Sequence, residues 1–383
     1  MKRKLVLTLA GLGLLTGAGA VRAQSSVTLY GVIDVGIDWN NNSGGQKLWH
    51  MQDGTYDGMY GSRWGLKGIE DLGGGWKALF VLENGFNLNN GSLGQSGRMF
   101  GRQAFVGLSN DRYGTVRVGR QYDSIVDYIQ PVTLTGNLGG LFIHSGDIDN
   151  TANSFRVNNA IKYTSPTFGG LTFGGLYSFT NSNADGVGTT GVWSLGASYS
   201  YKTLNLAAAY FYAKKPASLF NDGDFVSNTA GAAIGASGPF SYVGNPGNQQ
   251  IVGVGGSYGI GAFTLGADYT NTRFDDANGT SSSVRFSNYE AWLSYSVTTA
   301  LTLGAGYTFT DGKVDYLDAK PKYHQINLAA DYHISKRTEF YLNAAVQQAS
   351  GDAKSADLFD AVIGNASSTN RQLAMRLGVV HKF

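Results

Sequence analysis

Apolar and polar residues alternate along most of this chain. In LAMRLGVVHKF, residues 373–383, every second side chain from Leu373 onward is mostly apolar, and the positions between them include Arg376 and Lys382. A repeat of two residues is typical of a strand with one apolar face. The same alternation appears in segments 26–38, 155–163, 171–179, 192–201, 204–212, 262–270, 289–297, 301–309, 323–333 and 338–347. The pattern therefore predicts an all-β protein.

Connections of two lengths separate the predicted strands. Seven short turns are expected near 71–75, 110–114, 165–170, 202–203, 259–261, 297–300 and 335–337. Eight long segments rich in Gly, Asn and Asp lie near 40–58, 87–98, 121–154, 181–190, 214–248, 273–284, 311–320 and 349–369. Together they join about sixteen strands, and an even strand number with short turns and long loops is typical of an outer-membrane barrel.

The apolar faces distinguish a membrane barrel from a soluble sandwich. A sandwich packs two apolar inner faces together, and its outer residues are richer in charge and Thr. Here aromatic residues stand near strand ends, as in LAAAYFY (206–212) and GAGYTFT (304–310), and this suits the two interfaces of a membrane. We therefore expect a transmembrane antiparallel β-barrel of about 16 strands, whose last strand pairs with its first. Because side chains cannot fill so wide a lumen, a water-filled channel is expected.

The first 23 residues have the pattern of a secretory signal peptide. Lys2, Arg3 and Lys4 precede an apolar run that ends at Ala20, and VRA at 21–23 supplies small residues before a cleavage site ahead of Gln24. A transmembrane anchor fits less well because the run is short for a span and contains glycines. We expect 1–23 to be removed on export and 24–383 to form the barrel.

Removal of that segment changes the charge balance. The whole chain has 29 Lys and Arg, 27 Asp and Glu, and a net charge of +2. Four of the basic residues lie in 1–23, so the remaining 25 against 27 acidic residues give a net charge of −2. This balance does not support nucleic-acid binding. The absence of cysteine excludes a disulfide framework and thiolate chemistry.

The side chains that carry enzyme chemistry are few and dispersed. The five histidines stand at positions 50, 144, 324, 333 and 381, and no HExxH motif occurs. The sequence shows no cluster with metal-ligand spacing and no phosphate-binding Gly-rich loop. An enzyme housed in a barrel is therefore the less favoured alternative, and we expect no catalytic residues, no metal and no cofactor.

Several longer stretches resemble one family. SVTLYGVIDVGI (26–37), SRWGLKG (62–68), GRQAFVGLSNDRYGTVRVGRQYD (101–123) and FRVNNAIKYTSP (155–166) are similar to the trimeric general-diffusion porins of the Gram-negative outer membrane, in their beta-proteobacterial branch. The resemblance implies a homotrimer in outer-membrane lipid with one pore in each subunit. It also implies a third loop, near 121–154, that folds inward and narrows the pore, with basic wall residues opposite acidic loop residues.

The C-terminal run RLGVVHKF carries a second resemblance. It is similar to the recognition signal of outer-membrane barrels, with Arg376, Gly378, His381 and Phe383 at the matching positions. The resemblance implies contact with the barrel-assembly machinery through the C-terminal strand.

Three arginines match the basic wall of that family: Arg63, Arg102 and Arg156. Alternation independently supports two of them, because Arg63 shares a face with Lys67 and Arg156 shares a face with Lys162. The residues around Arg102 are equally apolar on both faces, so alternation does not decide its direction.

Three acidic residues are candidates for the other side of the constriction. Glu83 shares an inward face with Lys77 in WKALFVLENG, and Asp123 and Asp127 lie in the predicted third loop. Together with the arginines they predict a passive diffusion channel for small hydrophilic solutes and ions.

Arginines clustered in a narrow passage raise the local concentration of anions, because low-dielectric walls focus their field. We therefore expect an anion-leaning channel. A substrate-specific channel for phosphate or an organic anion would use the same arginines and remains an alternative, as does a structural or adhesive barrel that conducts nothing. Each arginine could also be a solvated charge paired with a carboxylate, without effect on selectivity.

Overall fold

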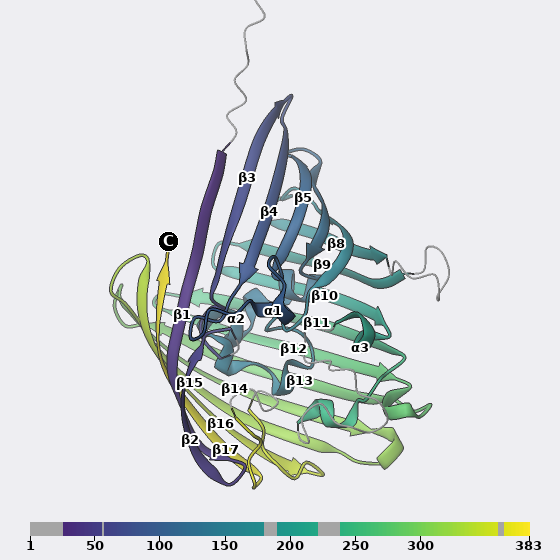
Figure 1. Ribbon diagram of the computed structural model, residues 1–383, viewed down its shortest axis with the longest axis vertical. Coiled ribbons are helices and arrows are strands. Elements are labelled where there is room, and N and C mark those ends of the chain that lie inside the picture. Colours follow the sequence, from purple (N-terminus) through teal and green to yellow (C-terminus); the bar gives the residue numbers. More distant parts are fainter. Residues whose placement is uncertain (1–25, 56, 180–189, 221–237, 359–363) are drawn as a thin grey trace, which may run out of the picture.

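The strands of this protein form one antiparallel sheet that closes on itself (Figure 1). The computed structural model describes residues 26–55, 57–179, 190–220, 238–358 and 364–383, so the predicted signal peptide lies outside the described residues. The strands are β1 (Ser26–Ser43), β2 (Gln46–Asp53), β3 (Arg63–Gly73), β4 (Trp76–Gly85), β5 (Gln103–Asn110), β6 (Gly114–Gln121), β7 (Val157–Thr164), β8 (Leu171–Phe179), β9 (Thr190–Tyr201), β10 (Leu204–Lys214), β11 (Asn248–Ile260), β12 (Phe263–Asp275), β13 (Val284–Ser296), β14 (Leu301–Val314), β15 (Pro321–His333), β16 (Thr338–Gly351) and β17 (Arg371–Lys382).

The helical segments are short. They are the α-helices α1 (Gly94–Gly97), α2 (Leu134–Leu138) and α3 (Pro216–Leu219), the π-helix η1 (Ile125–Ile129), and the 3₁₀ turns η2 (Gln130–Val132), η3 (Gly140–Phe142), η4 (Ser145–Asp147), η5 (Pro239–Tyr242), η6 (Ala277–Gly279) and η7 (Asp315–Leu317). Within the described residues, none of these helices is long and apolar enough to cross a membrane.

β1 closes the barrel by pairing on both of its edges. Its residues Val32 to Asn40 pair with Lys382 to Ala374 of β17. On the other edge, β2 pairs with the half of β1 that ends at Ser43, and β3 pairs with the half that begins at Ser26. β2 and β3 are therefore two parts of one barrel strand, interrupted by residues 54–62. The barrel has sixteen strand positions, and the prediction of a 16-stranded antiparallel barrel is confirmed.

Side chains alternate between an outer apolar face and an inner polar face. In β17, Met375 and Leu377 are exposed, whereas Gln372 and Arg376 are buried inside. Exposed leucines and valines continue this outer face on other strands, among them Leu195, Leu206, Val254, Leu265 and Leu342. Exposed aromatic residues lie close to the short turns: Tyr201, Tyr258, Phe263, Tyr295 and Tyr332. An apolar band bordered by aromatic residues matches a bilayer and its interface.

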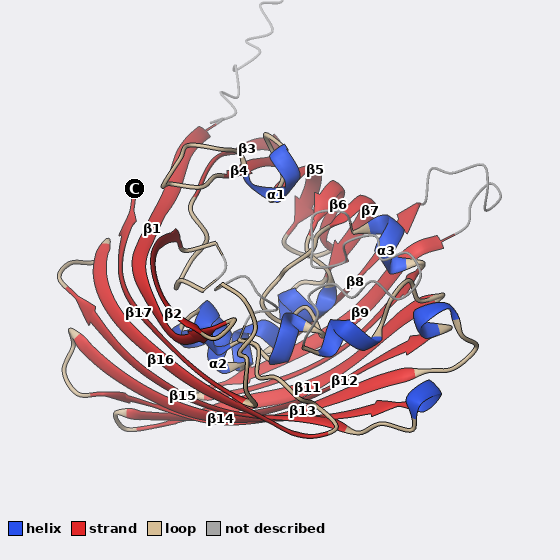
Figure 2. Cartoon of the chain, turned by 60° about the horizontal axis from the view of Figure 1, so that its bottom comes forward, coloured by secondary structure: helices blue, strands red, loops and turns tan. Residues whose placement is uncertain are grey.

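The third loop, residues 122–156, lies inside the ring of strands, as the helical segments in Figure 2 show. Glycines of the wall make room for it. A Cβ atom on Gly196 would stand 2.2 Å from a ring carbon of Tyr128, and one on Gly304 would stand 2.1 Å from Leu138 Cδ1. Both separations are too short for any side chain, so these strand glycines allow the loop to approach the backbone.

Hydrogen bonds attach the same loop to the opposite wall. Trp292 of β13 donates its indole N–H to the carbonyl of Val132 at 3.0 Å. The backbone N–H of Leu134 donates to Glu290 Oε1 at 2.6 Å. The loop is therefore held at a set depth in the lumen by contacts with strands more than 100 residues away in sequence.

Arg376 joins the closing strand to the first loop. Its Nη1 donates to Asp38 Oδ2 of β1 and to Asp57 Oδ1, each at 2.9 Å, and its Nε donates to the hydroxyl of Tyr341 at 2.7 Å. Its side chain is completely buried. The guanidinium group thus connects strands at the closure with the segment that interrupts β2 and β3.

The other residues of the C-terminal motif lie in different surroundings. A Cβ on Gly378 would stand 2.2 Å from Tyr341, so this glycine admits the tyrosine ring beneath Arg376. His381 is exposed beside the hydroxyl of Thr338, at 2.9 Å from its Nδ1, and Phe383 is exposed at the end of the chain. Only His381 and Phe383 of the four are therefore accessible in the folded barrel.

We expect Arg376→Met to lower the free energy of unfolding by about 3–5 kcal/mol, because it leaves buried carboxylates without their cation. Urea unfolding of the barrel in detergent measures this difference. Arg371→Met is the matched control, since Arg371 lies on the same strand and is exposed, and its effect should stay within about 0.5 kcal/mol. Equal losses in the two variants would contradict the assigned role of Arg376.

Candidate pore constriction

Four side chains converge on the carboxylate of Glu83. Its Oε1 accepts hydrogen bonds from Arg102 Nε at 2.8 Å and from the hydroxyl of Tyr122 at 3.3 Å. Its Oε2 accepts one from the hydroxyl of Tyr30 at 2.9 Å and lies 3.7 Å from Arg63 Nε. These residues come from β1, β3, β4, the approach to β5 and the start of the third loop.

Strand register explains why distant residues meet at this carboxylate. Glu83 is opposite Gly65 of β3 on one side and Gln103 of β5 on the other. Arg63 is the first residue of β3, where the chain returns to the wall after the interruption at 54–62. Arg102 immediately precedes β5, and its backbone N–H donates to the carbonyl of Glu83 at 3.2 Å. Val106 and Leu108, which share its parity, are exposed, whereas Arg102 is buried, so Arg102 does not follow the alternation of β5.

The two arginines on Glu83 differ in their access to water. The side chain of Arg63 is 21% exposed, compared with 9% for Arg102 and 6% for Glu83. Two guanidinium groups therefore share one buried carboxylate, and Arg63 is the more exposed of the two.

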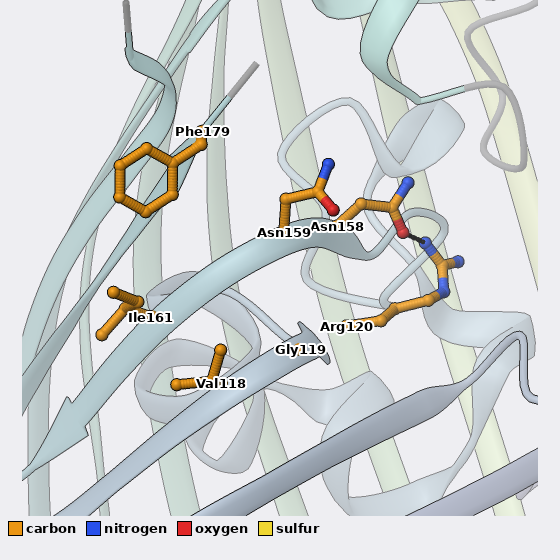
Figure 3. Close-up of a pocket in the computed structure, with 7 residues that line it drawn as sticks. All are labelled: Val118, Gly119, Arg120, Asn158, Asn159, Ile161 and Phe179. Atoms are coloured by element: carbon orange, nitrogen blue, oxygen red, sulfur yellow. Dashed lines mark hydrogen bonds between the residues drawn. The ribbon is translucent and has the colours of Figure 1, made fainter. Parts of the chain in front are cut away.

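Arg156 and Arg120 continue the basic surface along the wall. Arg156 lies over the ring of Tyr122, with its guanidinium carbon 5.9 Å from the ring centroid, and donates to the carbonyl of Ser154 at 3.3 Å. Arg120 donates to Asn158 Oδ1 at 2.6 Å and to the Arg156 carbonyl at 3.3 Å (Figure 3). Tyr122 thus contacts both Arg102 and Arg156, and links the two parts of the basic surface.

Sequence reasoning missed Arg120 because the alternation of β6 breaks at this residue, beside a β-bulge in β7. Val116 and Val118 of β6 face outward, so strict alternation places Arg120 outward as well. The pairing of β6 with β7 shifts between Gly119 and Gln121, where Arg120 stands opposite two residues of β7, Asn158 and Asn159, and the side chain of Arg120 is buried. Gly119, with a φ of +137°, and Asn159, with a φ of +51°, mark this irregularity on the two strands.

The bulge leaves a crevice of about 440 Å³ between β6 and β7. Figure 3 shows its lining side chains: Val118, Ile161 and Phe179 at one end and Arg120 with Asn158 at the other. The arginine therefore lies at the polar end of an otherwise largely apolar crevice.

The two loop acids are engaged in other interactions. Asp123 is fully buried, and its Oδ1 accepts from the backbone N–H of Ile125 at 2.7 Å while its Oδ2 accepts from Asn150 at 2.7 Å. Burial raises the pKa of Asp123 to about 6, although these hydrogen bonds oppose the increase. Asp127 forms an ion pair with Lys162 of β7. Asp123 therefore folds the loop, and Asp127 attaches it to the wall.

Two other features bear on chemistry. GGSYG, residues 255–259, has the spacing of a GxSxG motif, but it lies within β11 and pairs with β10 and β12 rather than forming a strand-to-helix turn. In the described part of the chain, two groups have the geometry to hold a metal ion: His144 with Asp268 and Glu290, and Asp331 with His333 and Glu339. Neither group includes a residue of the arginine surface.

Comparisons with known proteins agree with this architecture. A family model described as Gram-negative porin matches residues 8–352. An outer membrane porin protein of Bordetella pertussis is 34% identical over 288 residues, which cover 69% of this chain and 69% of that protein.

Solved structures extend the similarity to nearly the whole chain. The anion-selective porin from Comamonas acidovorans has a TM-score of 0.74 and 26% identity, covering 94% of this chain and 100% of that chain. The trimer form of OmpT, an outer membrane protein of Vibrio cholerae, has a TM-score of 0.68, with 94% of this chain and 99% of that chain covered. Its identity of 15% shows a common fold alone.

The raised pKa of Asp123 predicts a pH-dependent contribution to stability. Between the folded pKa of about 6 and the ordinary value of 3.8, the folded protein binds a proton that the unfolded chain does not. The cost of the buried charge is therefore present at pH 7 and disappears as the pH falls through 6 toward 4. Asp123→Asn carries no charge at any pH. Between pH 7 and pH 4, the free energy of unfolding of the wild type should therefore rise by up to about 3 kcal/mol relative to that of Asp123→Asn.

Urea unfolding of the two proteins between pH 7 and pH 4 measures this gain. Asp111→Asn is the control, because Asp111 is exposed in a turn. A difference between wild type and Asp123→Asn that does not change with pH would contradict the prediction.

Proposed function

This chain belongs to the family of Gram-negative porins and is a β-barrel channel protein of the outer membrane, and from that premise we propose that it conducts small hydrophilic solutes and ions passively, with a preference for anions. The observation that carries the preference is the sharing of the Glu83 carboxylate by Arg63 and Arg102. Two guanidinium groups and one carboxylate leave a net positive charge. Arg63 is the more exposed of the two arginines and presents this charge to the water of the lumen.

The mechanism is electrostatic selection in a narrowed passage. The third loop reduces the open cross-section, so a permeating ion passes close to the wall. Low-dielectric surroundings focus the field of the guanidinium groups and raise the local anion concentration. Arginine stays charged at every physiological pH, so the preference does not require a protonation event. Exposed charges are screened over about 10 Å at 0.1 M salt, so concentrated salt should weaken the selection.

The acidic side of the constriction is weak in this proposal. Asp123 is used in folding the third loop, and Asp127 is neutralised by Lys162. Arg120 and Arg156 extend the basic surface beyond Glu83. The similar Comamonas protein is an anion-selective porin, and the selectivity of that relative supports the same direction of selectivity here.

The proposed assembly is a homotrimer in outer-membrane lipid, with one pore in each subunit. The outer apolar face with its aromatic border supplies the lipid contact. The resemblance of this sequence to the trimeric general-diffusion porins supports the assembly. At the C-terminus, the exposed His381 and Phe383 are the residues of the motif that a barrel-assembly partner could reach in the folded chain. The activity proposed is transport without catalysis.

The selectivity is tested by replacing Arg63, Arg102 and Arg156 together with Ala. In a planar bilayer under a salt gradient, the wild type should show an anion-leaning reversal potential. The triple variant should lose most of this preference, with a several-fold fall in the ratio of anion to cation permeability, because pore-lining charge sets selectivity. Glu83→Gln should shift the potential in the opposite direction, since it removes the carboxylate that the two arginines share.

Arg112→Ala is the matched control, because Arg112 lies exposed in the turn between β5 and β6. Its reversal potential should equal that of the wild type. Unchanged selectivity in the triple variant would overturn the arginine assignment, and the absence of current from a folded wild-type barrel would overturn the channel function. Saturation of the current by phosphate or one organic anion would instead favour a substrate-specific channel.

The homotrimer is tested by the mass of the detergent-folded protein and by its conductance. Light scattering corrected for bound detergent should give the mass of three chains, and single insertions should close in three equal steps because each subunit has its own pore. A stable monomer with a single conductance level would contradict the proposed assembly.

A further inference from the structure

A buried group of ionisable side chains joins the third loop to the wall away from the arginine surface. It consists of His144 in the loop, Asp268 on β12 and Glu290 on β13, and the side chains of all three are enclosed. His144 Nε2 lies 3.4 Å from Asp268 Oδ1 and 3.6 Å from Glu290 Oε2. One donor atom from each residue lies within 4.8 Å of the others.

A fourth residue orients the imidazole ring. Asp149 Oδ2 lies 2.6 Å from His144 Nδ1, and Thr270 and Asn288 donate hydrogen bonds to the same oxygen. Because a carboxylate accepts hydrogen bonds, Nδ1 carries its proton toward Asp149, and Nε2 lies on the side of Asp268 and Glu290. A metal-ligating imidazole commonly donates its other ring N–H to a carboxylate in this way.

The atoms at the centre of this group lack hydrogen-bond partners. Among the described residues, neither oxygen of Asp268 has one, and neither has His144 Nε2. Buried polar atoms are normally satisfied, and a missing ion is one of the few explanations when they are not. Two of these unsatisfied atoms, His144 Nε2 and Asp268 Oδ1, lie 3.4 Å apart.

The charges of the group also favour a bound cation. Asp149, Asp268 and Glu290 bring three carboxylates together, and His144 is their one ion-pair partner among the residues that the structure describes. Buried carboxylates require pairing, protonation or a metal ion. Even a charged imidazolium would leave the group with excess negative charge.

We propose that His144, Asp268 and Glu290 bind one divalent transition-metal ion of the zinc class. Two donors of a tetrahedral zinc ion, bonded at about 2.0–2.2 Å, stand about 3.3–3.6 Å apart. The separations of 3.4 and 3.6 Å from Nε2 match that requirement. The imidazole nitrogen argues against calcium and magnesium, which take oxygen ligands.

The ion would fasten the third loop to two wall strands. Its nitrogen ligand belongs to the loop and its oxygen ligands belong to the wall, so binding holds the loop at its depth in the lumen. Because the site is enclosed, the ion enters during folding and leaves only when the loop opens. This site does not depend on the proposed selectivity, since metal content is measured apart from conductance.

The test is to refold the tag-free mature chain in detergent with Zn²⁺ or with a chelator, dialyse it, and measure the bound metal. The wild type should retain one zinc ion per chain and should unfold at a higher temperature than the chelator-treated protein. Asn has nearly the same shape as Asp, and the side chain of Asp268 makes no hydrogen bond that the substitution would break. The Asp268→Asn barrel should therefore fold, but the zinc that it retains should fall at least tenfold.

Two controls separate this site from others. His324→Gln removes a partly exposed outward histidine, and Asp331→Asn disrupts the second group with metal-binding geometry, at the end of β15. Both should retain the zinc of the wild type. Loss of zinc in Asp331→Asn but not in Asp268→Asn would overturn the assignment.

A measurement on the wild type alone covers the case in which Asp268→Asn does not fold. Refolding with Co²⁺ should produce the visible absorption of a tetrahedral or five-coordinate cobalt site with nitrogen and oxygen ligands. A folded wild type that retains neither zinc nor cobalt would overturn the proposal and leave a protonated His144 as the cation of the group.

Discussion

The requirement that every backbone N–H and C=O be satisfied within hydrocarbon governs the rest of this structure. A strand in a bilayer has no water to bond with, so the sheet must close, and β1 closes it by pairing with β17. Closure then separates two environments on the two faces of each strand. Apolar side chains face lipid, and the remaining side chains face a lumen that they must share with water and with the chain's own loops.

The polar lumen explains why three buried ionic groups hold the loops. Arg376 holds the first loop through Asp57, Lys162 holds the start of the third loop through Asp127, and His144 joins its later part to Asp268 and Glu290. Inside a barrel, a loop cannot be packed by a conventional hydrophobic core alone, because many wall positions are polar. Glycines such as Gly196 and Gly304 admit apolar side chains of the third loop where the wall allows it. The third loop is therefore fixed by a combination of close packing and buried charge.

Alternation recovered the barrel, the positions of its seven turns and the approximate loops, since the period of two is a direct consequence of strand geometry. It also put Arg63, Glu83 and Arg156 on inward faces. It failed at the irregular positions: Arg102 precedes its strand, and Arg120 lies opposite a β-bulge of β7, where the alternation of β6 breaks. The division of one barrel strand into β2 and β3 is likewise hidden from alternation, because most of β2 falls within the loop expected near 40–58. Each of these features depends on pairing with a neighbouring strand.

The sequence by itself determined the closed barrel, its outer apolar band and the inward faces of Arg63, Glu83 and Arg156, because these follow from the alternation of residue types and from the fixed geometry of a strand. Tertiary structure alone decided which charges meet. Glu83 lies between Arg63 and Arg102, and Asp123 is withdrawn into the loop. His144 meets Asp268 and Glu290 from more than 120 residues away. Such contacts depend on the path of a loop through the lumen, and no local pattern encodes that path.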